Sequence, residues 1–390
     1  MEKFMALGVM SVLCFVLPLI HGGKTIPTRN QNGSEDWGYV EVRPKAHLFW
    51  WLYKSPYRVE DPSKPWPIVL WLQGGPGASG VGIGNFEEVG PLDTDLKPRN
   101  STWLHKADLL FIDNPVGTGY SFVEDTKDLN LFVKNDVEAA NDLTTLLEKL
   151  FNRDEKLQKS PLFIVAESYG GKFAVTLGLS TLKAIEAGKL KLTLGGVALG
   201  DSWISPEDFV FSWGPLLKDV SRLDDNGLKS SDGLAEKIKH QIQEGRLEDA
   251  TNSWNELERV ISAGSNGVDF YNFLLDSGTD SVSSFTSLEL SKVIATKRYS
   301  RYLSTLRSTP GGGNSLDSLM NGAIKWEGLQ TFLSKDRTPL YCDNESSTKG
   351  FTSSYKNLHF YWILGAGHFV PVDQPCLALK MVGQITNSPR

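Results

Sequence analysis

The sequence predicts an α/β protein with a mostly parallel central sheet that is buried on both faces. Six short runs are continuously apolar, as expected for strands covered on both faces. A segment with helical periodicity lies between two of these runs, and glycine- or proline-rich turns follow most of them. The predicted strands are residues 48–53, 68–72, 109–112, 162–165, 195–199 and 359–364.

The predicted helices fall into two groups. Residues 132–151 form an amphipathic helix between the third and fourth strands. Its apolar face is made of Val133, Val137, Ala140, Leu143, Leu147 and Leu150. The stretch of about 202–325 is charged, helical in pattern and punctuated by glycine and serine. We interpret this stretch as a helical insertion, or cap, within a single domain that spans residues 24–390 and is large enough to bury a substantial core.

The amino-terminal sequence has the pattern of a signal peptide. Lys3 precedes an apolar run over residues 4–20, which small residues follow, and this run is short for a membrane anchor. We therefore expect residues 1–23 to be cleaved, an entry into the secretory pathway towards the cell exterior or a vacuole, and no stable membrane insertion afterwards. The net charge of −6 excludes the basic footprint of a nucleic-acid-binding protein.

Glycosylation sequons and cysteines agree with that route. The sequons begin at Asn32, Asn100 and Asn344, each in a polar, turn-rich stretch. Cys14 leaves with the signal peptide. Cys342 and Cys376 remain, and the sequence leaves open whether they pair.

Ser168 is the predicted nucleophile. It follows the apolar strand 162–165 and precedes the glycine pair 170–171, which is the arrangement of a nucleophile elbow. Ala166 stands where the common Gly-x-Ser-x-Gly pattern has its first glycine. Small residues around the serine allow the strand and the next helix to approach closely, so the hydroxyl stands above the sheet.

A glycine-rich loop after strand 68–72 is the predicted oxyanion hole. Its sequence from Gln73 is Gln-Gly-Gly-Pro-Gly, and glycines leave backbone N–H groups unshielded for a developing negative charge. We expect the N–H groups of Gly75 and Tyr169, the residue after the nucleophile, to be its donors.

His368 is the predicted general base. It lies in the loop Gly-Ala-Gly-His-Phe-Val-Pro after the last predicted strand, where the order of nucleophile, acid and histidine along such chains places the base. The other five histidines are expected to lie at the signal boundary, in packed positions or on the surface: His21, His47, His105, His240 and His359.

Four segments in this order resemble the serine carboxypeptidase family. They are residues 71–77, 113–121, 167–171 and 367–371. Gln73 and the run from Ser168 to Lys172 are most similar to the branch of plant serine carboxypeptidase-like and retinoid-inducible proteins. The resemblance implies an α/β-hydrolase fold, a Ser-Asp-His triad, no cofactor or metal, and release of C-terminal residues from peptides with a free C-terminus in acidic compartments.

The resemblance also gives two residues a role in holding the substrate carboxylate. Family enzymes use a protonated glutamate just before the nucleophile, which is Glu167 here, and an asparagine in the oxyanion loop, whose position Gln73 occupies. A carboxyl group bonds a carboxylate only while it keeps its proton, so this device favours acidic pH. Ala78 replaces a cysteine that is common in the family, which removes the disulfide that it would make.

The triad aspartate has no clear counterpart, and the acid stays unassigned. The aspartates weighed for this role are Asp201, Asp317, Asp336 and Asp343. Asp201 follows a strand, but it precedes the cap and is interpreted as structural. The chain passes from Lys325 to Trp326 as though two flanks of a removed segment were joined, which a splice form or a truncated gene model would produce.

This gap predicts a chain with little hydrolytic activity. Without the strand that carries the acid, the last strand (359–364) either pairs directly with strand 195–199, which displaces His368, or detaches with the C-terminal segment. Two other functions stay open: an acyltransferase that uses activated esters on the same fold, and a non-catalytic secreted binding protein.

Overall fold

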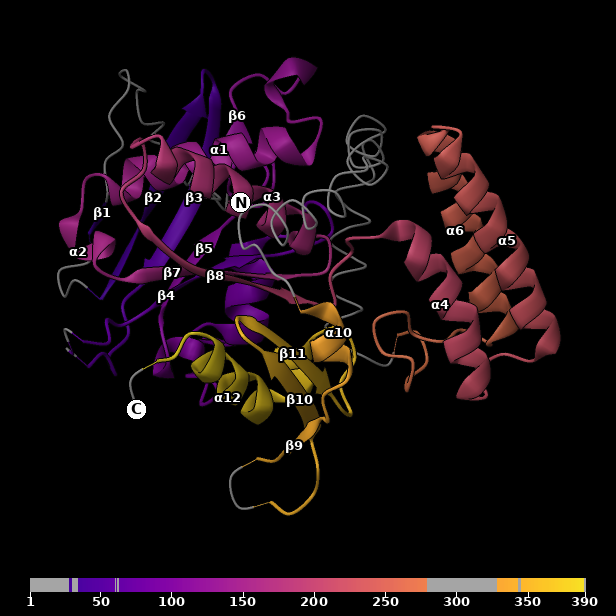
Figure 1. Ribbon diagram of the computed structural model, residues 1–390. Helices are drawn as coiled ribbons and strands as arrows, with labels where there is room; N and C mark the ends of the chain where they lie inside the picture. The colour runs from indigo at the N-terminus through magenta and orange to yellow at the C-terminus, as the bar shows by residue number, and fades with distance from the viewer. Residues whose placement is uncertain are drawn as a thin grey trace, which may run out of the picture.

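The computed structural model describes residues 28–29, 34–59, 61, 63–278, 328–342 and 345–388 (Figure 1). Within these residues, eight strands form the central sheet in the order β1-β2-β3-β5-β4-β7-β8, and β6 pairs with β3. The strands are β1 (Thr28–Arg29), β2 (Glu35–Arg43), β3 (Ala46–Tyr53), β4 (Ile68–Leu72), β5 (Asp108–Ile112), β6 (Phe122–Val123), β7 (Pro161–Glu167) and β8 (Thr193–Gly200).

The sheet is mixed, and its parallel half carries the predicted catalytic loops. Strands β5, β4, β7 and β8 are parallel neighbours, whereas β1, β2, β3 and β6 pair antiparallel. Every residue of β4 and β5 is buried, which explains why these strands read as continuous apolar runs. The predicted α/β class is confirmed.

Helices cover both faces of the sheet. Helices α1 (Asp136–Phe151) and α3 (Gly170–Glu186) share one hydrophobic core with one face. The helices η1 (Gly80–Val89) and η2 (Trp103–His105) pack on the other face with the C-terminal α12 (Pro375–Ile385). The short helices η3 (Leu129–Leu131) and α2 (Glu155–Gln158) flank α1 in the chain.

The apolar face of α1 differs in one residue from the sequence prediction. Val137 is 58% exposed, while Ala140, Leu143 and Leu147 are buried. The Asn135 side chain caps the helix by accepting the Glu138 N–H, so Val137 lies in the first turn, at the edge of the buried face.

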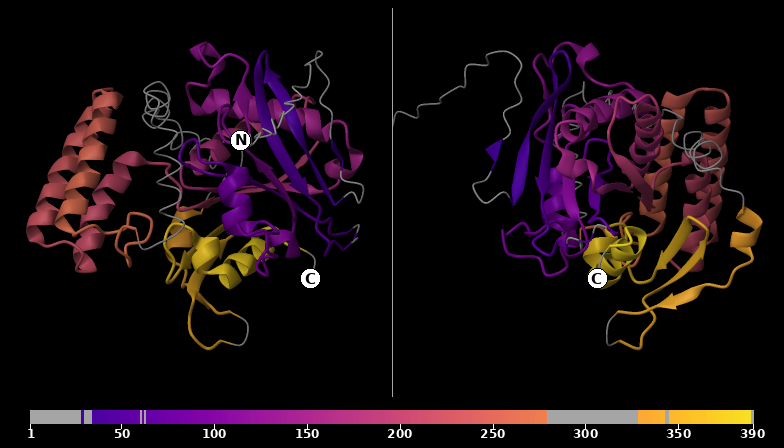
Figure 2. Two further views of the ribbon diagram at one scale, coloured as in Figure 1. Left: turned by 180° about the vertical axis from the view of Figure 1, so that it is seen from behind. Right: turned by 60° about the vertical axis from the view of Figure 1, so that its left-hand side comes forward.

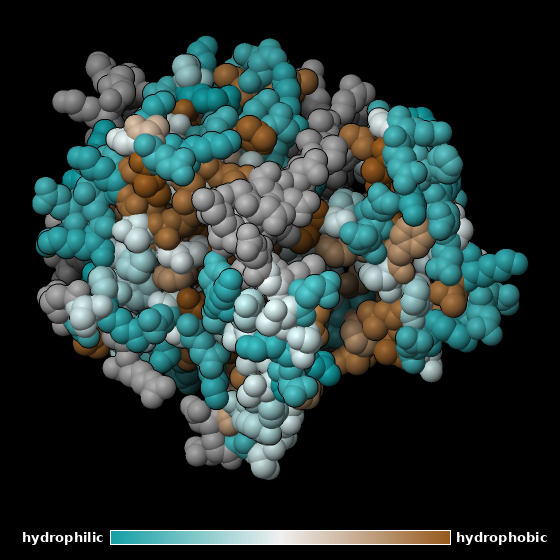
Figure 3. Space-filling model, viewed as in Figure 1, coloured by the Kyte–Doolittle hydropathy of each residue, from teal (hydrophilic) through white to brown (hydrophobic). Residues whose placement is uncertain are grey.

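Three helices occupy the described part of the predicted insertion. They are α4 (Pro206–Asp219), α5 (Asp225–Gln243) and α6 (Leu247–Gly264), which pack on one another around their own hydrophobic core. This unit stands beside the sheet (Figures 1 and 2). Its outer side is mostly hydrophilic, and hydrophobic residues gather on the side nearest the sheet (Figure 3).

The C-terminal strands form a second sheet, which contradicts the prediction that strand 359–364 belongs to the parallel sheet. Strand β11 (Leu358–Ile363) pairs antiparallel with β10 (Gly350–Tyr355), which pairs with β9 (Thr338–Leu340). The last strand therefore does not slide over to pair with β8. Short α10 (Leu329–Leu333) and α11 (Val370–Asp373) complete this region.

The C-terminal region nevertheless stays packed on the body of the protein. Ala378 and Val382 of α12 are buried against Trp71 and Phe111 in one core cluster. A disulfide joins Cys342 to Cys376, so the pairing that the sequence leaves open is present. The last strand is thus separate from the main sheet, while the C-terminal segment stays attached to the body of the protein.

Candidate active site

Ser168 lies on a sharp turn between β7 and α3. Its φ is 58°, a left-handed conformation that is uncommon for residues other than glycine and marks local backbone strain. The turn requires glycines around it: a Cβ on Gly170 would lie 2.3 Å from the Leu72 carbonyl oxygen, and one on Gly74 would lie 2.6 Å from the Ser168 Cβ. The geometry is that of the predicted nucleophile elbow.

The glycine-rich loop after β4 lies directly against this turn. A Cβ on Gly74 would also lie 2.9 Å from the Tyr169 backbone nitrogen. Gly75 has a φ of 103°, which a side chain would disfavour. The loop and the start of α3 therefore bring Gly75 and Tyr169, the two predicted oxyanion donors, to the same place beside Ser168.

Gln73 and Glu167 are buried side by side at the ends of β4 and β7. The Gln73 Nε2 donates to Glu167 Oε1 over 2.8 Å, and the Trp71 Nε1 donates to Gln73 Oε1 over 2.6 Å. Because Trp71 occupies the amide oxygen, the amide nitrogen must face Glu167. The longer side chain of glutamine is thus held in one orientation by a residue that the sequence analysis did not single out.

A second glutamate, Glu88 at the end of η1, lies beside this pair. Glu88 and Glu167 are 1% and 3% exposed. Burial raises the pKa of Glu88 to about 7. Burial also raises the pKa of Glu167 well above its ordinary value, and the nearby Glu88 and Asp201 carboxylates raise it further. Both groups therefore hold protons at a pH where exposed glutamates are ionised.

Asp113 anchors the start of η1, the helix near whose end Glu88 lies. Its carboxylate accepts from the Ser79 hydroxyl (2.6 Å), the Val81 N–H (3.1 Å) and the Tyr120 N–H (2.8 Å). A Cβ on Gly119 would collide with this carboxylate at 2.1 Å. The sequence motif at 113–121 is therefore a buried anchor for the start of η1.

His368 is fixed by contacts with the segment that follows the cap helices. Its backbone N–H donates to the Tyr271 carbonyl oxygen over 2.5 Å, and its ring meets the Tyr271 ring edge-on with centroids 5.2 Å apart. The preceding Gly367 N–H donates to Asp373 Oδ2 over 2.6 Å. Tyr271 was not predicted as part of the site, because nothing in the sequence ties it to a loop almost one hundred residues later.

Asp201 lies beside His368, whereas the sequence indicates only a structural role for it. Its Oδ2 is 3.6 Å from His368 Nδ1, and its Oδ1 accepts the Ser168 backbone N–H over 3.3 Å. Its side chain is 28% exposed. Desolvation by the surrounding protein raises the pKa of Asp201, while His368 and the Ser168 N–H lower it.

One small pocket brings the nucleophile, the base and the Gln73–Glu167 pair together. A cavity of about 40 Å³ is lined by Gln73, Gly75, Glu167, Ser168 and His368, together with Gly74, Ala78, Ile83, Tyr271 and Phe369. In the part of the chain that the structure describes, no residue hydrogen-bonds the Ser168 hydroxyl, although His368 lines the same pocket. Hydrogen bonds between a nucleophile and its base are often long without substrate and tighten in the complex.

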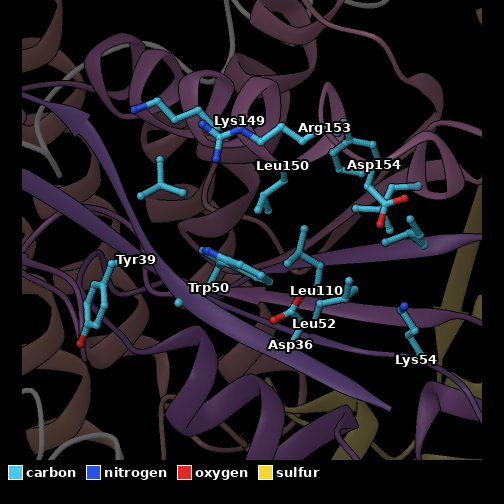
Figure 4. Close-up of a pocket in the computed structure, with 15 residues that line it drawn as sticks. Asp36, Tyr39, Trp50, Leu52, Lys54, Leu110, Lys149, Leu150, Arg153 and Asp154 are labelled. Carbon is cyan, nitrogen blue, oxygen red and sulfur yellow. The ribbon is translucent and has the colours of Figure 1, made fainter. Parts of the chain in front are cut away.

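A larger cavity lies elsewhere and contains none of the predicted site residues. Its volume is about 220 Å³, and it lies between strands β2 and β3 and the end of α1 (Figure 4). Trp50, Leu52 and Leu110 form an apolar floor, and Lys149 and Arg153 stand on its rim. Its size alone gives it no chemistry, so the smaller pocket with the converging polar groups is the candidate active site.

Comparison with known proteins agrees with this geometry. The sequence model of the serine carboxypeptidase family matches residues 27–309 and 314–388. The chain belongs to the serine carboxypeptidase family. It is 57% identical to serine carboxypeptidase-like 51 of Arabidopsis thaliana, covering 97% of this chain and 98% of that protein. It is 39% identical to the human retinoid-inducible serine carboxypeptidase, covering 95% and 96%. It is thus a serine carboxypeptidase-like hydrolase.

A solved structure confirms the α/β-hydrolase fold. The prohormone-processing carboxypeptidase Kex1(Δ)p of Saccharomyces cerevisiae is similar with a TM-score of 0.71 at 20% identity, covering 90% of this chain and 91% of that one.

The comparison with the Arabidopsis relative also shows that part of that protein has no counterpart here. The Arabidopsis alignment runs over 452 positions, to which this chain contributes 97% of its 390 residues, or about 378. At least about 74 positions (452 less 378) are therefore unmatched. The family match breaks between residues 309 and 314, near the predicted junction at Lys325 and Trp326. Both places lie outside the described residues.

Several predicted features also lie outside the described residues. These are the signal peptide at 1–23, the sequons at Asn32 and Asn344, and the acid candidates Asp317 and Asp343. Asn100 is described and lies in an exposed turn. Among the described helices, none combines the length and the apolar character that a membrane span requires.

Proposed function

We propose that this hydrolase removes C-terminal residues from peptides with a free C-terminus. The observation that carries the proposal is the hydrogen bond from Gln73 Nε2 to Glu167 Oε1, which places two buried polar side chains in the pocket of Ser168. A buried pair of this kind next to a nucleophile is suited to hold a small anionic group, and a peptide carboxylate is such a group.

In this proposal the reaction proceeds by nucleophilic catalysis. The Ser168 hydroxyl attacks the carbonyl carbon of the last peptide bond while His368 Nε2 accepts its proton. The N–H groups of Gly75 and Tyr169 donate to the oxyanion that forms. His368 then gives the proton to the leaving amine, and water hydrolyses the acyl-enzyme by the same path.

Recognition of the carboxylate depends on the proton of Glu167. The neutral carboxyl donates its O–H to the substrate carboxylate, and an ionised one would repel it. Because the pKa of Glu167 is raised by burial and by Glu88, Glu167 keeps its proton through the acidic range. We accordingly propose an acidic compartment of the secretory route, such as a vacuole, or an acidic exterior as the site of action.

The test is a pair of peptides with the same sequence, one with a free C-terminus and one amidated. Release of the last residue is followed by mass spectrometry between pH 4.5 and 7.5. We expect the free peptide to be cleaved faster, with an advantage that shrinks as pH rises, and Glu167→Gln to flatten that pH dependence. Equal cleavage of both peptides by the parent protein at every pH would overturn the proposal.

A further inference from the structure

Asp201 stands at the same edge of the sheet as the nucleophile. Glu167 of β7 pairs in parallel register with Gly200 of β8, so Ser168 and Asp201 are the next residues on neighbouring strands. The Ser168 N–H donates to the Gly200 carbonyl oxygen over 3.1 Å and to Asp201 Oδ1 over 3.3 Å. Asp201 has a φ of 33°, an unusual conformation that turns its side chain away from the line of the strand.

The other carboxylate oxygen of Asp201 faces the base. Its distance of 3.6 Å to His368 Nδ1 makes it the one carboxylate within 4 Å of this histidine in the part of the chain that the structure describes. Nδ1 is the nitrogen that an orienting acid engages when Nε2 serves the nucleophile. The separation exceeds a normal N–H···O bond of about 2.7–3.2 Å, and catalytic hydrogen bonds are often long without substrate and tighten in the complex.

The loop of His368 holds this position without support from the central sheet. It is tied to Tyr271 through the His368 N–H, and a Cβ on Gly367 would lie 2.4 Å from the Tyr271 carbonyl oxygen. Phe369 stacks on the Tyr271 ring at 5.6 Å. Although strand β11 lies in a separate sheet, His368 still lies in the pocket of Ser168 and next to Asp201.

We propose that Asp201 is the positioning carboxylate for His368 in this chain, in place of an acid from the segment that the relatives have and this chain lacks. This inference rests on the proposed function for the role of His368. Asp201 accepts a hydrogen bond from Nδ1–H, which leaves Nε2 free to accept the Ser168 proton, and its negative charge stabilises the imidazolium that forms.

The surrounding charges are compatible with an ionised Asp201. The titratable groups that face it are His368 from the loop, Glu167 from β7 and Glu88 from η1. The two glutamates hold protons in the acidic range, so they place no competing negative charge beside Asp201 there. As pH rises and Glu88 ionises, the cluster gains repulsion between neighbouring carboxylates.

The test compares Asp201→Asn with Asp201→Glu and with Asp276→Asn. Asparagine keeps the shape and the acceptor for the Ser168 N–H, so the fold is preserved, and glutamate restores the charge. Asp276 follows the cap helix α6, pairs with Arg222 and does not line the pocket. Its replacement therefore controls for the loss of a carboxylate elsewhere in the protein. The rate of Ser168 modification by a fluorophosphonate is measured against pH, and the tautomer of His368 is read from imidazole ¹⁵N shifts.

We expect Asp201→Asn to slow modification by about 10²–10⁴-fold, to move the acidic limb of the rate profile to lower pH, and to reduce the Nδ1–H tautomer. Asp201→Glu should recover part of the rate, and Asp276→Asn should leave all three unchanged. An unchanged rate and tautomer in Asp201→Asn would overturn the inference while leaving the proposed function intact. If the parent protein is not modified at all, the proposed function fails, and the tautomer still tests the role of Asp201.

Discussion

Replacing Glu88 by glutamine should remove a large part of the pH dependence of folding stability. The native pKa of this buried carboxyl is about 7, against 4.5 for an exposed one, and Glu88 is 1% exposed. Because the folded state binds the proton more tightly than the unfolded chain, this group stabilises the fold below about pH 4.5, and the contribution is lost as pH rises through 7. A difference of about 2.5 pKa units corresponds to about 3 kcal/mol.

The assay is urea unfolding followed by tryptophan fluorescence at intervals from pH 4.5 to 7.5. We expect the unfolding free energy of the parent protein to fall across this range, and the fall in Glu88→Gln to be smaller by about 3 kcal/mol. Glu87→Gln makes the same chemical change one residue earlier, at a half-buried side chain, and should keep the slope of the parent. Parallel pH profiles for the parent protein and Glu88→Gln would refute the reasoning.

Three other variants test the pocket and the C-terminal disulfide. Trp71→Phe removes the N–H that orients Gln73 and should raise KM for free peptides with a smaller effect on amidated ones; equal effects would argue against the orientation. Gly74→Ala places a Cβ 2.6 Å from the nucleophile's own Cβ and should lower the rate of serine modification at least tenfold, and an unchanged rate would contradict the close approach. Cys342→Ser with Cys376→Ser opens a link across 34 residues and should lower the unfolding free energy by about 2–4 kcal/mol, measured by urea unfolding under non-reducing conditions; an unchanged midpoint would show that the link does not stabilise the fold.

Local patterns predicted the elements whose burial follows from their own sequence. The run before Ser168 is apolar on both faces, and the glycines after it permit the tight turn, so the strand, the turn and the helix were all predictable. Val137 was placed wrongly because it lies in the first turn of α1, at the edge of the face that the rest of the helix buries. Strand β11 was placed wrongly because an apolar run shows that a strand is present but not which sheet it joins.

The site residues that the sequence did not predict depend on contacts between segments that are distant in the chain. Asp201 and His368 are far apart in the sequence, and their approach follows from the Tyr271 segment that holds the histidine loop. Glu88 follows Glu87 in a helix where an acidic pair is typical of a solvated surface, and only the packing of η1 against β4 and β5 buries it. The one sequence signal for Glu88 is that it follows the glycine-rich loop that lies beside the nucleophile.

The central claim is that this chain, despite its absent segment, assembles a hydrolase site around Ser168. The most direct measurement is intact-mass and peptide mapping of the purified chain after treatment with a fluorophosphonate, alongside Ser168→Ala. The account predicts one adduct, located on Ser168, in the parent protein and none in the variant. A folded parent protein that gains no adduct, or an adduct that persists in Ser168→Ala, would contradict it.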